Sequence, residues 1–204
     1  MSVLYHSIVI FVRNTGKAFF GLTVEGLEHV PSQGKVLIAA NHQSYLDPPL
    51  LGSVLPREIN YLAKVELFRN PLFGALLRHL NCIPINRSGQ DMESLRRAIR
   101  VLDSGGALLV FPEGTRSRRG DFLRPTRGLG LLAKQSGAPV VPAYIHGTRG
   151  FWRRLFRPGG LRVVFGEPLH FSAFNVEQLK GGDRYQAFSD EVMQIIAALK
   201  AARP

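Results

Sequence analysis

Short apolar runs that alternate with longer amphipathic stretches are the feature that most constrains the fold of this chain. The runs are LTVEGLEHV (22–30), KVLIAA (35–40), INYLA (59–63), CIPI (82–85), ALLVF (107–111), APVVPAYI (138–145) and LRVVFG (161–166). Their length and composition are typical of buried strands. Strands that alternate with helices indicate the α/β class. We therefore expect one α/β domain with a mostly parallel or mixed sheet flanked by helices.

Two longer stretches carry apolar residues at helical spacing. Residues 91–104 repeat them every three or four positions and end at Gly105-Gly106, a common way to stop a helix. Residues 184–201 place a similar stripe on one face. A length of 204 residues fits a single domain with a sizeable core.

The N-terminal segment is apolar but short. Residues 3–12 read VLYHSIVIFV, which is less than the roughly 18 residues of a spanning helix and lacks the features of a signal peptide. With KAFFGLTV behind it, the segment is suited to lie on a bilayer as an interfacial helix, and the alternative is a helix packed on the domain. We expect residues 1–21 to form this segment and residues 22–204 the main domain.

The charge of the chain indicates an anionic partner. There are 26 Lys and Arg against 15 Asp and Glu, which gives a net charge of +11. Residues 149–162, RGFWRRLFRPGGLR, combine five arginines with aromatic residues. Such a segment could stack nucleic-acid bases, but it suits an anionic membrane surface better. The predicted membrane-contact residues are Phe151, Trp152, Arg153, Arg154 and Phe156.

Several common sites are absent from the sequence. A single cysteine, Cys82, excludes an internal disulfide. The chain has no nucleophile elbow, no phosphate-binding P-loop and no zinc-protease motif. Its six histidines have no cysteine or acidic companions at ligand spacing. We therefore expect no bound metal and no cofactor.

The stretch AANHQSYLDPP (39–49) holds a histidine and an aspartate five positions apart. On a continuous helix, His42 and Asp47 would diverge by about 140°. They meet if the chain leaves a strand at His42, turns, and enters a helix near Asp47. The pair is then either a catalytic dyad or an ordinary histidine beside an aspartate that caps a helix beginning at Pro48.

Charged residues follow three of the predicted strands. His42 follows 35–40, Arg87 follows 82–85, and Glu113 follows 107–111. Ligands of α/β sheets bind outside the carboxyl ends of strands, which is where these residues fall. In FPEGTRSRRG (111–120) the arginines offer planar forks that match phosphate oxygens, and a glycine allows close approach of a ligand. The alternative for this stretch is a solvated basic loop.

In this order, the stretches resemble the glycerolipid acyltransferase family, whose best-known members are the 1-acylglycerol-3-phosphate acyltransferases. The first family block is Asn-His, four residues and Asp, and Asn41, His42 and Asp47 match it. The third block, Phe-Pro-Glu-Gly-Thr-Arg-Ser, is matched at residues 111–117 without exception. Val141-Pro142 is similar to the fourth block.

The second family block is only partly matched. Ile83, Ile85 and Arg87 agree with it, and the departures are Asn81, Pro84 and Asn86. Residues 63–74, AKVELFRNPLFG, look like the family segment between the first two blocks. The resemblance covers residues 26–168.

The resemblance implies acyl transfer from a thioester to a hydroxyl. In that chemistry His42 is the general base, Asp47 holds its other ring nitrogen, and the acceptor attacks directly without an acyl-enzyme. The implied substrate-binding residues are Lys64, Arg87, Glu113, Gly114, Thr115 and Arg116. The expected acceptor is a lysophospholipid, first of all 1-acylglycerol-3-phosphate, and the donor is acyl-CoA or acyl carrier protein.

Other readings stay open at this point. The same fold can act on a different lysolipid, such as a lyso-ornithine lipid, or hydrolyse the thioester. A basic nucleic-acid-binding module is the alternative of another class, whereas the acyltransferase reading has no nucleic-acid partner. We expect the protein to be peripheral on the cytoplasmic face of a cell membrane, such as the inner membrane of a bacterium.

Overall fold

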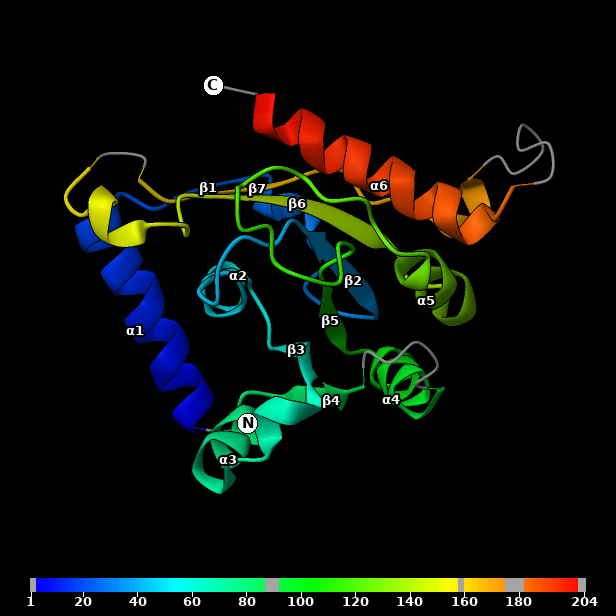
Figure 1. The fold of residues 1–204 in the computed structure, drawn as a ribbon, viewed down its shortest axis with the longest axis horizontal. Coiled ribbons are helices and arrows are strands. Elements are labelled where there is room, and N and C mark those ends of the chain that lie inside the picture. Colours follow the sequence, from blue (N-terminus) through cyan, green and yellow to red (C-terminus); the bar gives the residue numbers. More distant parts are fainter. Residues whose placement is uncertain (1–2, 87–91, 158–159, 175–181, 202–204) are drawn as a thin grey trace.

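The computed structural model describes residues 3–86, 92–157, 160–174 and 182–201 (Figure 1). The helices are α1 (Val3–Phe20), α2 (Asp47–Val54), α3 (Pro71–His79), α4 (Met92–Asp103), α5 (Gly128–Ser136) and α6 (Arg184–Ala201). The strands are β1 (Thr23–Glu25), β2 (Val36–Ala40), β3 (Ile59–Lys64), β4 (Cys82–Ile85), β5 (Ala107–Val110), β6 (Val140–His146) and β7 (Arg162–Phe165). Short 3-10 helices are η1 (Leu27–His29), η2 (Val65–Phe68), η3 (Phe151–Arg154) and η4 (Phe171–Ala173).

The strands form one mixed sheet in the order β1-β7-β6-β2-β5-β3-β4. Strands β6, β2, β5, β3 and β4 pair in parallel, whereas β7 is antiparallel to β6 and parallel to β1. The predicted α/β class with a mixed sheet is confirmed. Since parallel strands end at the same edge, the loops after β2, β4 and β5 leave the sheet together.

Strand β2 lies at the centre and is buried on both faces. Val36, Ile38 and Ala40 face one apolar core, and Leu37 and Ala39 face the other. Figure 1 shows α1 and α2 over the first face, and α4, α5 and α6 over the second. A parallel strand covered on both faces is a continuous apolar run, which explains the sequence of residues 35–40.

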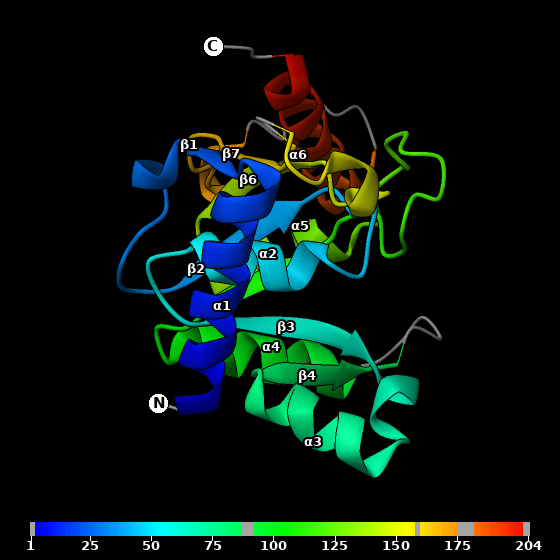
Figure 2. The same cartoon turned by 90° about the vertical axis from the view of Figure 1, so that its left-hand side faces the viewer.

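Helix α1 packs on the domain with one side and exposes the other. Tyr5 and Phe20 are buried, and the Tyr5 hydroxyl accepts a hydrogen bond from the Ile59 N–H at 3.2 Å. Val3 and Phe11 on the outer side are 82% and 70% exposed. Figure 2 shows α1 running from the level of α3 up to β1. Helix α1 therefore packs on the domain, while its interfacial role and the division at residue 21 stay predictions.

Within the part of the chain that the structure describes, no helix has the length and apolarity needed to cross a bilayer.

The strand predicted over residues 22–30 is partly wrong. Only Thr23–Glu25 is extended, because Gly26 has a φ of +68° and the chain then turns into η1. A Cβ at Gly26 would lie 2.1 Å from the Phe165 carbonyl oxygen, so the turn also needs the absence of a side chain. The predicted helix over 184–201 is confirmed at both ends, and that over 91–104 is confirmed from Met92 to Asp103.

Candidate active site

The loop after β2 brings His42 and Asp47 into contact. The His42 Nδ1–H donates to Asp47 Oδ2 at 2.8 Å, because a carboxylate oxygen can only accept. The same oxygen accepts from the backbone N–H groups of Gln43 at 2.6 Å and Ser44 at 2.7 Å. Asp47 is fully buried. The bond at Nδ1 leaves the Nε2 atom of neutral His42 without a proton and able to accept one.

The helix-cap reading of Asp47 is wrong. Helix α2 begins at Asp47 itself, its N-cap position is Leu46, and no side chain caps it. The aspartate carboxylate turns back into the loop, where His42, Gln43 and Ser44 supply donors. The His42–Asp47 contact that a strand, turn and helix would allow is therefore present.

The loop after β5 holds the backbone of His42 from both sides. Glu113 Oε1 accepts from the His42 N–H at 2.8 Å, and the His42 carbonyl accepts from the Ser117 N–H at 2.8 Å. The Phe111 ring stacks on the imidazole with centroids 3.9 Å apart. These contacts join the first and third sequence blocks into one unit, since the loops leave adjacent parallel strands.

Glu113, one of the predicted acceptor ligands, bonds to backbone groups of two loops. Its second carboxylate oxygen accepts from the Leu123 N–H at 2.9 Å, so both oxygens are bonded to backbone groups. The side chain is buried, and burial raises the pKa of Glu113 while the bonds from His42 and Leu123 oppose that rise. This placement gives no support to an acceptor contact and indicates a brace between loops.

Gly114 allows the turn that follows this brace. Its φ of +65° is in the left-handed region, which favours glycine, whereas a Cβ there would meet only Thr126 at 3.5 Å. Conformation rather than space therefore demands glycine. The turn brings Thr115 and Arg116 to the lining of a large pocket.

The large pocket lies between α1, α2, α3 and β3 and has a volume of about 600 Å³. Its polar mouth consists of His42, Tyr45, Lys64, Thr115 and Arg116. Its apolar interior is built by side chains that include Tyr5, Ile8, Val9, Leu76, Leu77 and Leu80. The exposed members, such as Tyr45 and Thr115, mark where the pocket opens.

The pocket brings together three of the six predicted substrate-binding residues. Lys64, Thr115 and Arg116 line it, while the Glu113 carboxylate bonds to backbone groups. Arg87 lies outside the described residues. Among the described residues, no group of three or more His, Cys, Asp or Glu side chains is placed to hold a metal ion.

The sequence did not predict the apolar interior. Its residues come mainly from α1, α3 and β3, which are far apart in the chain. The segment 63–74 was the available signal, because it places Leu67 and Phe73 beside Lys64 in the pocket lining. The role of Asn41 was also missed: its amide donates to the Ile145 carbonyl at 3.0 Å and accepts from the Ile145 N–H at 2.7 Å.

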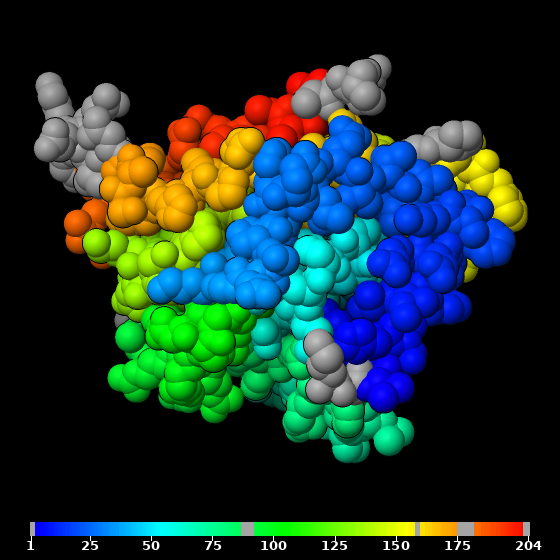
Figure 3. All heavy atoms as spheres, turned by 180° about the vertical axis from the view of Figure 1, so that it is seen from behind, coloured from blue at the N-terminus to red at the C-terminus, as the bar shows by residue number. Residues whose placement is uncertain are grey.

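The predicted membrane-contact residues lie on and after η3, at the end of α1. Trp152 and Phe156 are 70% and 71% exposed, whereas Phe151 packs against Phe20 with ring centroids 5.6 Å apart. The Phe156 ring also packs edge to face against the Phe19 ring of α1, with ring centroids 5.7 Å apart. Figure 3 shows this yellow segment beside the dark blue helix at one edge of the molecule. Arg153 is exposed and Arg154 is half-buried.

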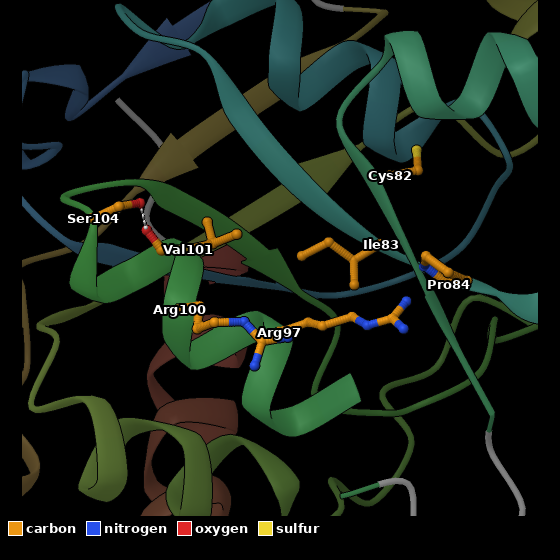
Figure 4. Close-up of a pocket in the computed structure, with 7 residues that line it drawn as sticks. All are labelled: Cys82, Ile83, Pro84, Arg97, Arg100, Val101 and Ser104. Atoms are coloured by element: carbon orange, nitrogen blue, oxygen red, sulfur yellow. Dashed lines mark hydrogen bonds between the residues drawn. The ribbon is translucent and has the colours of Figure 1, made fainter. Parts of the chain in front are cut away.

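A smaller hollow of about 370 Å³ lies between β4 and α4 (Figure 4). Arg97 and Arg100 line it, and both donate to Glu93 Oε1 of the same helix at 3.0 and 3.3 Å. Among the described residues, Cys82 alone lines both this hollow and the large pocket. The hollow is therefore lined by α4 and β4, whereas α1, α2, α3 and β3 line the large pocket.

Comparisons with known proteins agree with this geometry. The family model described as Acyltransferase matches residues 21–146. A 1-acyl-sn-glycerol-3-phosphate acyltransferase of Bacillus subtilis is 32% identical over 181 residues, which cover 88% of each chain. The chloroplastic 1-acyl-sn-glycerol-3-phosphate acyltransferase LPAT1 of Arabidopsis thaliana is 30% identical, with 78% of this chain and 46% of the plant protein covered.

A solved structure is also similar over nearly the whole chain. The crystal structure of the 1-acyl-sn-glycerophosphate acyltransferase PlsC from Thermotoga maritima superposes with a TM-score of 0.75 at 30% identity. The match covers 98% of this chain and 81% of that one. The matched region contains the His42 loop, the Glu113 brace and most of the pocket, and the chain belongs to the acyltransferase family.

Proposed function

We propose that this acyltransferase moves a fatty acyl group from an acyl thioester to the free hydroxyl of 1-acylglycerol-3-phosphate, which yields phosphatidic acid. One observation carries the proposal: the bonded His42–Asp47 pair lies at the polar mouth of a pocket whose interior is apolar. The pocket thus offers a base, a cationic group and a site for hydrocarbon next to one another. The names of the Bacillus subtilis and Thermotoga maritima relatives support the same acceptor.

In the proposed reaction His42 Nε2 takes the proton of the acceptor hydroxyl as its oxygen attacks the thioester carbonyl. Asp47 holds Nδ1–H and stabilises the imidazolium that forms. The tetrahedral intermediate then collapses, the C–S bond breaks, and Nε2–H returns the proton to the leaving thiolate. One ester forms, one thioester is lost, and His42 ends in its starting state.

Direct attack by the acceptor is supported by the state of the thiol in the pocket. Burial raises the pKa of the Cys82 thiol to about 12, so the reactive thiolate is scarce at neutral pH. None of the hydrogen bonds of His42 goes to a serine or cysteine side chain among the described residues. The described residues therefore offer His42 no hydrogen-bonded nucleophile for an acyl-enzyme.

The polar mouth suits a phosphorylated acceptor. Lys64 and Arg116 are cations that line it beside His42. A phosphate monoester carries close to two negative charges, and an arginine fork can bind two of its oxygens at once. A lyso-ornithine lipid has no phosphate and offers these cations only a carboxylate with a single negative charge beside the ammonium group of ornithine.

The apolar interior suits the fatty acyl chain. It is lined by aliphatic and aromatic side chains of α1, α3 and β3, and its volume falls in the range of small-molecule sites. An acyl chain that enters past His42 would place its thioester carbonyl at the base. The nature of the carrier, acyl-CoA or acyl carrier protein, is decided by contacts outside this interior.

An acceptor screen tests the proposal. Purified protein receives labelled acyl-CoA or acyl carrier protein and 1-acylglycerol-3-phosphate, a lyso-ornithine lipid or water alone. We expect label in phosphatidic acid with at least one donor and little free fatty acid. Preferential labelling of the ornithine lipid would assign the other acceptor, and release of free fatty acid alone would assign thioester hydrolysis.

We also propose that the outer side of α1 and the exposed aromatic side chains on and just after η3 attach the protein to an anionic membrane. Phe11, Trp152 and Phe156 are exposed, and arginines surround the latter two. Changing Trp152 and Phe156 to serine should move the protein into the soluble fraction, most strongly at high salt, where the arginines are screened. Phe151 is left intact because it packs against Phe20.

The control for the membrane test is Met92→Ser, which removes an exposed apolar side chain on α4. It should leave vesicle binding unchanged. Retention of the unaltered protein on single-stranded DNA but not on anionic vesicles would favour the nucleic-acid reading instead.

A further inference from the structure

The guanidinium of Arg116 lies over the ring of Tyr45. Its central carbon is 3.5 Å from the ring centroid. Tyr45 belongs to the loop after β2, between His42 and Asp47, and Arg116 belongs to the loop after β5. Both side chains line the large pocket. The stack therefore joins the two loops at the polar mouth, on the outer side of the His42–Asp47 pair.

The Arg116 stack is the side-chain contact of Tyr45 that the described residues show. Its side chain is 70% exposed, and its hydroxyl makes no hydrogen bond to a described residue. Arg116 has no carboxylate within ion-pair distance in the described part of the chain. Among the described residues, the Tyr45 ring is therefore the group that holds the Arg116 guanidinium in place of a carboxylate.

A stacked arginine keeps its hydrogen-bonding capacity. The ring attracts the flat face of the guanidinium, whereas the N–H donors point outward in the guanidinium plane. The ring therefore fixes the orientation of the plane and leaves the fork free for two oxygens of a phosphate. A carboxylate partner would instead occupy those donors and neutralise the charge.

We infer that Tyr45 is a positioning residue that orients Arg116 for the phosphate of the acceptor. The inference rests on the proposed function. Three of the four residues between His42 and Asp47 then have a role: Gln43 and Ser44 donate to the aspartate, and Tyr45 holds the arginine.

The test compares Tyr45→Leu with Tyr45→Phe by steady-state kinetics, varying acceptor and donor separately. Tyr45→Leu removes the aromatic face and should raise the KM for 1-acylglycerol-3-phosphate about twofold to fivefold, as expected for an exposed cation–π contact. Its kcat and its KM for the acyl thioester should stay unchanged. Tyr45→Phe keeps the face and should behave as the unaltered protein.

A double-mutant cycle shows whether the effect passes through Arg116. In an Arg116→Ala background, Tyr45→Leu should have no further effect on the acceptor KM. The matched control is Tyr185→Leu, which removes a ring contacted by Arg127 and Arg184 away from the pocket. It should leave both KM values unchanged.

Three outcomes would overturn the role of Tyr45 but not the proposed function, provided that the unaltered protein acylates lysophosphatidate. They are an unchanged acceptor KM in Tyr45→Leu, an equal defect in Tyr45→Phe, and additive defects of Tyr45→Leu and Arg116→Ala. Failure of the unaltered protein to acylate any phosphorylated acceptor overturns the proposed function itself, and this role with it.

Discussion

The mouth and the interior of the large pocket are built in different ways. The mouth depends on two loops after parallel strands, tied together by hydrogen bonds to the backbone of His42. The interior depends on apolar side chains from helices and an edge region of the sheet, which are distant in sequence. The mouth thus fixes the positions of polar atoms around the reacting groups, whereas the interior fixes the shape of the space for an acyl chain. Changes at the mouth should alter chemistry and acceptor binding, and changes in the interior should alter only the choice of acyl chain.

The strongest test of this comparison is His42→Ala. Loss of the general base should lower kcat by about 10²- to 10⁴-fold while the thermal unfolding midpoint changes little. The control is His79→Ala, since His79 is exposed on α3 and, among the described residues, its side chain bonds to the Ala75 carbonyl alone. Labelled acyl transfer and circular dichroism on the same samples separate chemistry from folding. Normal turnover by folded His42→Ala protein would remove the base from the mechanism.

Arg116→Lys tests the acceptor side of the mouth. Lysine keeps the charge but loses the planar fork, so the KM for the phosphorylated acceptor should rise about tenfold to a hundredfold, from about 1.5–3 kcal/mol for a charged hydrogen bond. The KM for the acyl thioester should change far less. Arg118→Lys, two positions along the same loop and exposed, is the control and should have a smaller, salt-dependent effect. Equal weakening of donor and acceptor would show that Arg116 shapes the whole mouth.

Glu113→Gln tests whether the mouth depends on its brace. The pKa of Glu113 is raised by burial, so the folded protein holds the proton more tightly than the unfolded chain. The proton-linked part of its contribution to stability is therefore complete below its ordinary pKa and is lost as the pH rises through the raised value, whereas the ionised carboxylate keeps both backbone hydrogen bonds. Glutamine should abolish this slope. It also sets an amide N–H against a backbone N–H, which should lower the free energy of unfolding at neutral pH by about 1–3 kcal/mol.

Denaturant unfolding from about pH 4 to about pH 8 measures the effect of the Glu113 change. The control is Glu191→Gln, an exposed carboxylate on α6, whose unfolding profile should match the unaltered protein. A profile for Glu113→Gln that keeps the slope would assign the pH dependence to another group.

Val9→Phe gives the smallest effect and tests the interior. Val9 is half-buried and lines the pocket, so a larger side chain should exclude the end of a long acyl chain. Each excluded methylene should lower kcat/KM for long relative to short thioesters about fourfold, from about 0.8 kcal/mol per buried CH₂. The acceptor KM should not move. Ile10→Phe, one position along the same helix and outside the pocket lining, should leave the chain preference unchanged.

The difference between mouth and interior also decided what the sequence could predict. Strands β2 and β5 and the residues directly after them form contiguous patterns, so His42, Asp47 and the loop of Arg116 could be placed at one sheet edge before the structure was known. An apolar residue at helical spacing has the same pattern whether it faces a core or a pocket, so Tyr5 and Leu77 could not be assigned to the interior. Tertiary contacts alone make that distinction.

Residue type alone also leaves open which groups a side chain bonds to. The family resemblance implies that Glu113 is an acceptor ligand, and the structure adds that its oxygens accept from the N–H groups of His42 and Leu123. Asp47 was given a possible cap role because Pro48 follows it, yet its carboxylate turns back to His42. Sequence names the donor and acceptor groups, whereas the direction in which they point depends on the neighbouring loop.

Helix α1 is both an outer surface and a wall of the pocket. Tyr5, Ile8 and Val9 face the cavity, while Val3 and Phe11 face outward. A lipid surface that ordered the outer side of α1, as in the membrane attachment proposed above, would also order the wall against which an acyl chain packs. Thermodynamic reciprocity would then require that a bound acyl chain tighten attachment to that surface by the same factor by which the surface tightens chain binding. Membrane affinity and acyl-chain affinity would be two measures of one coupling free energy.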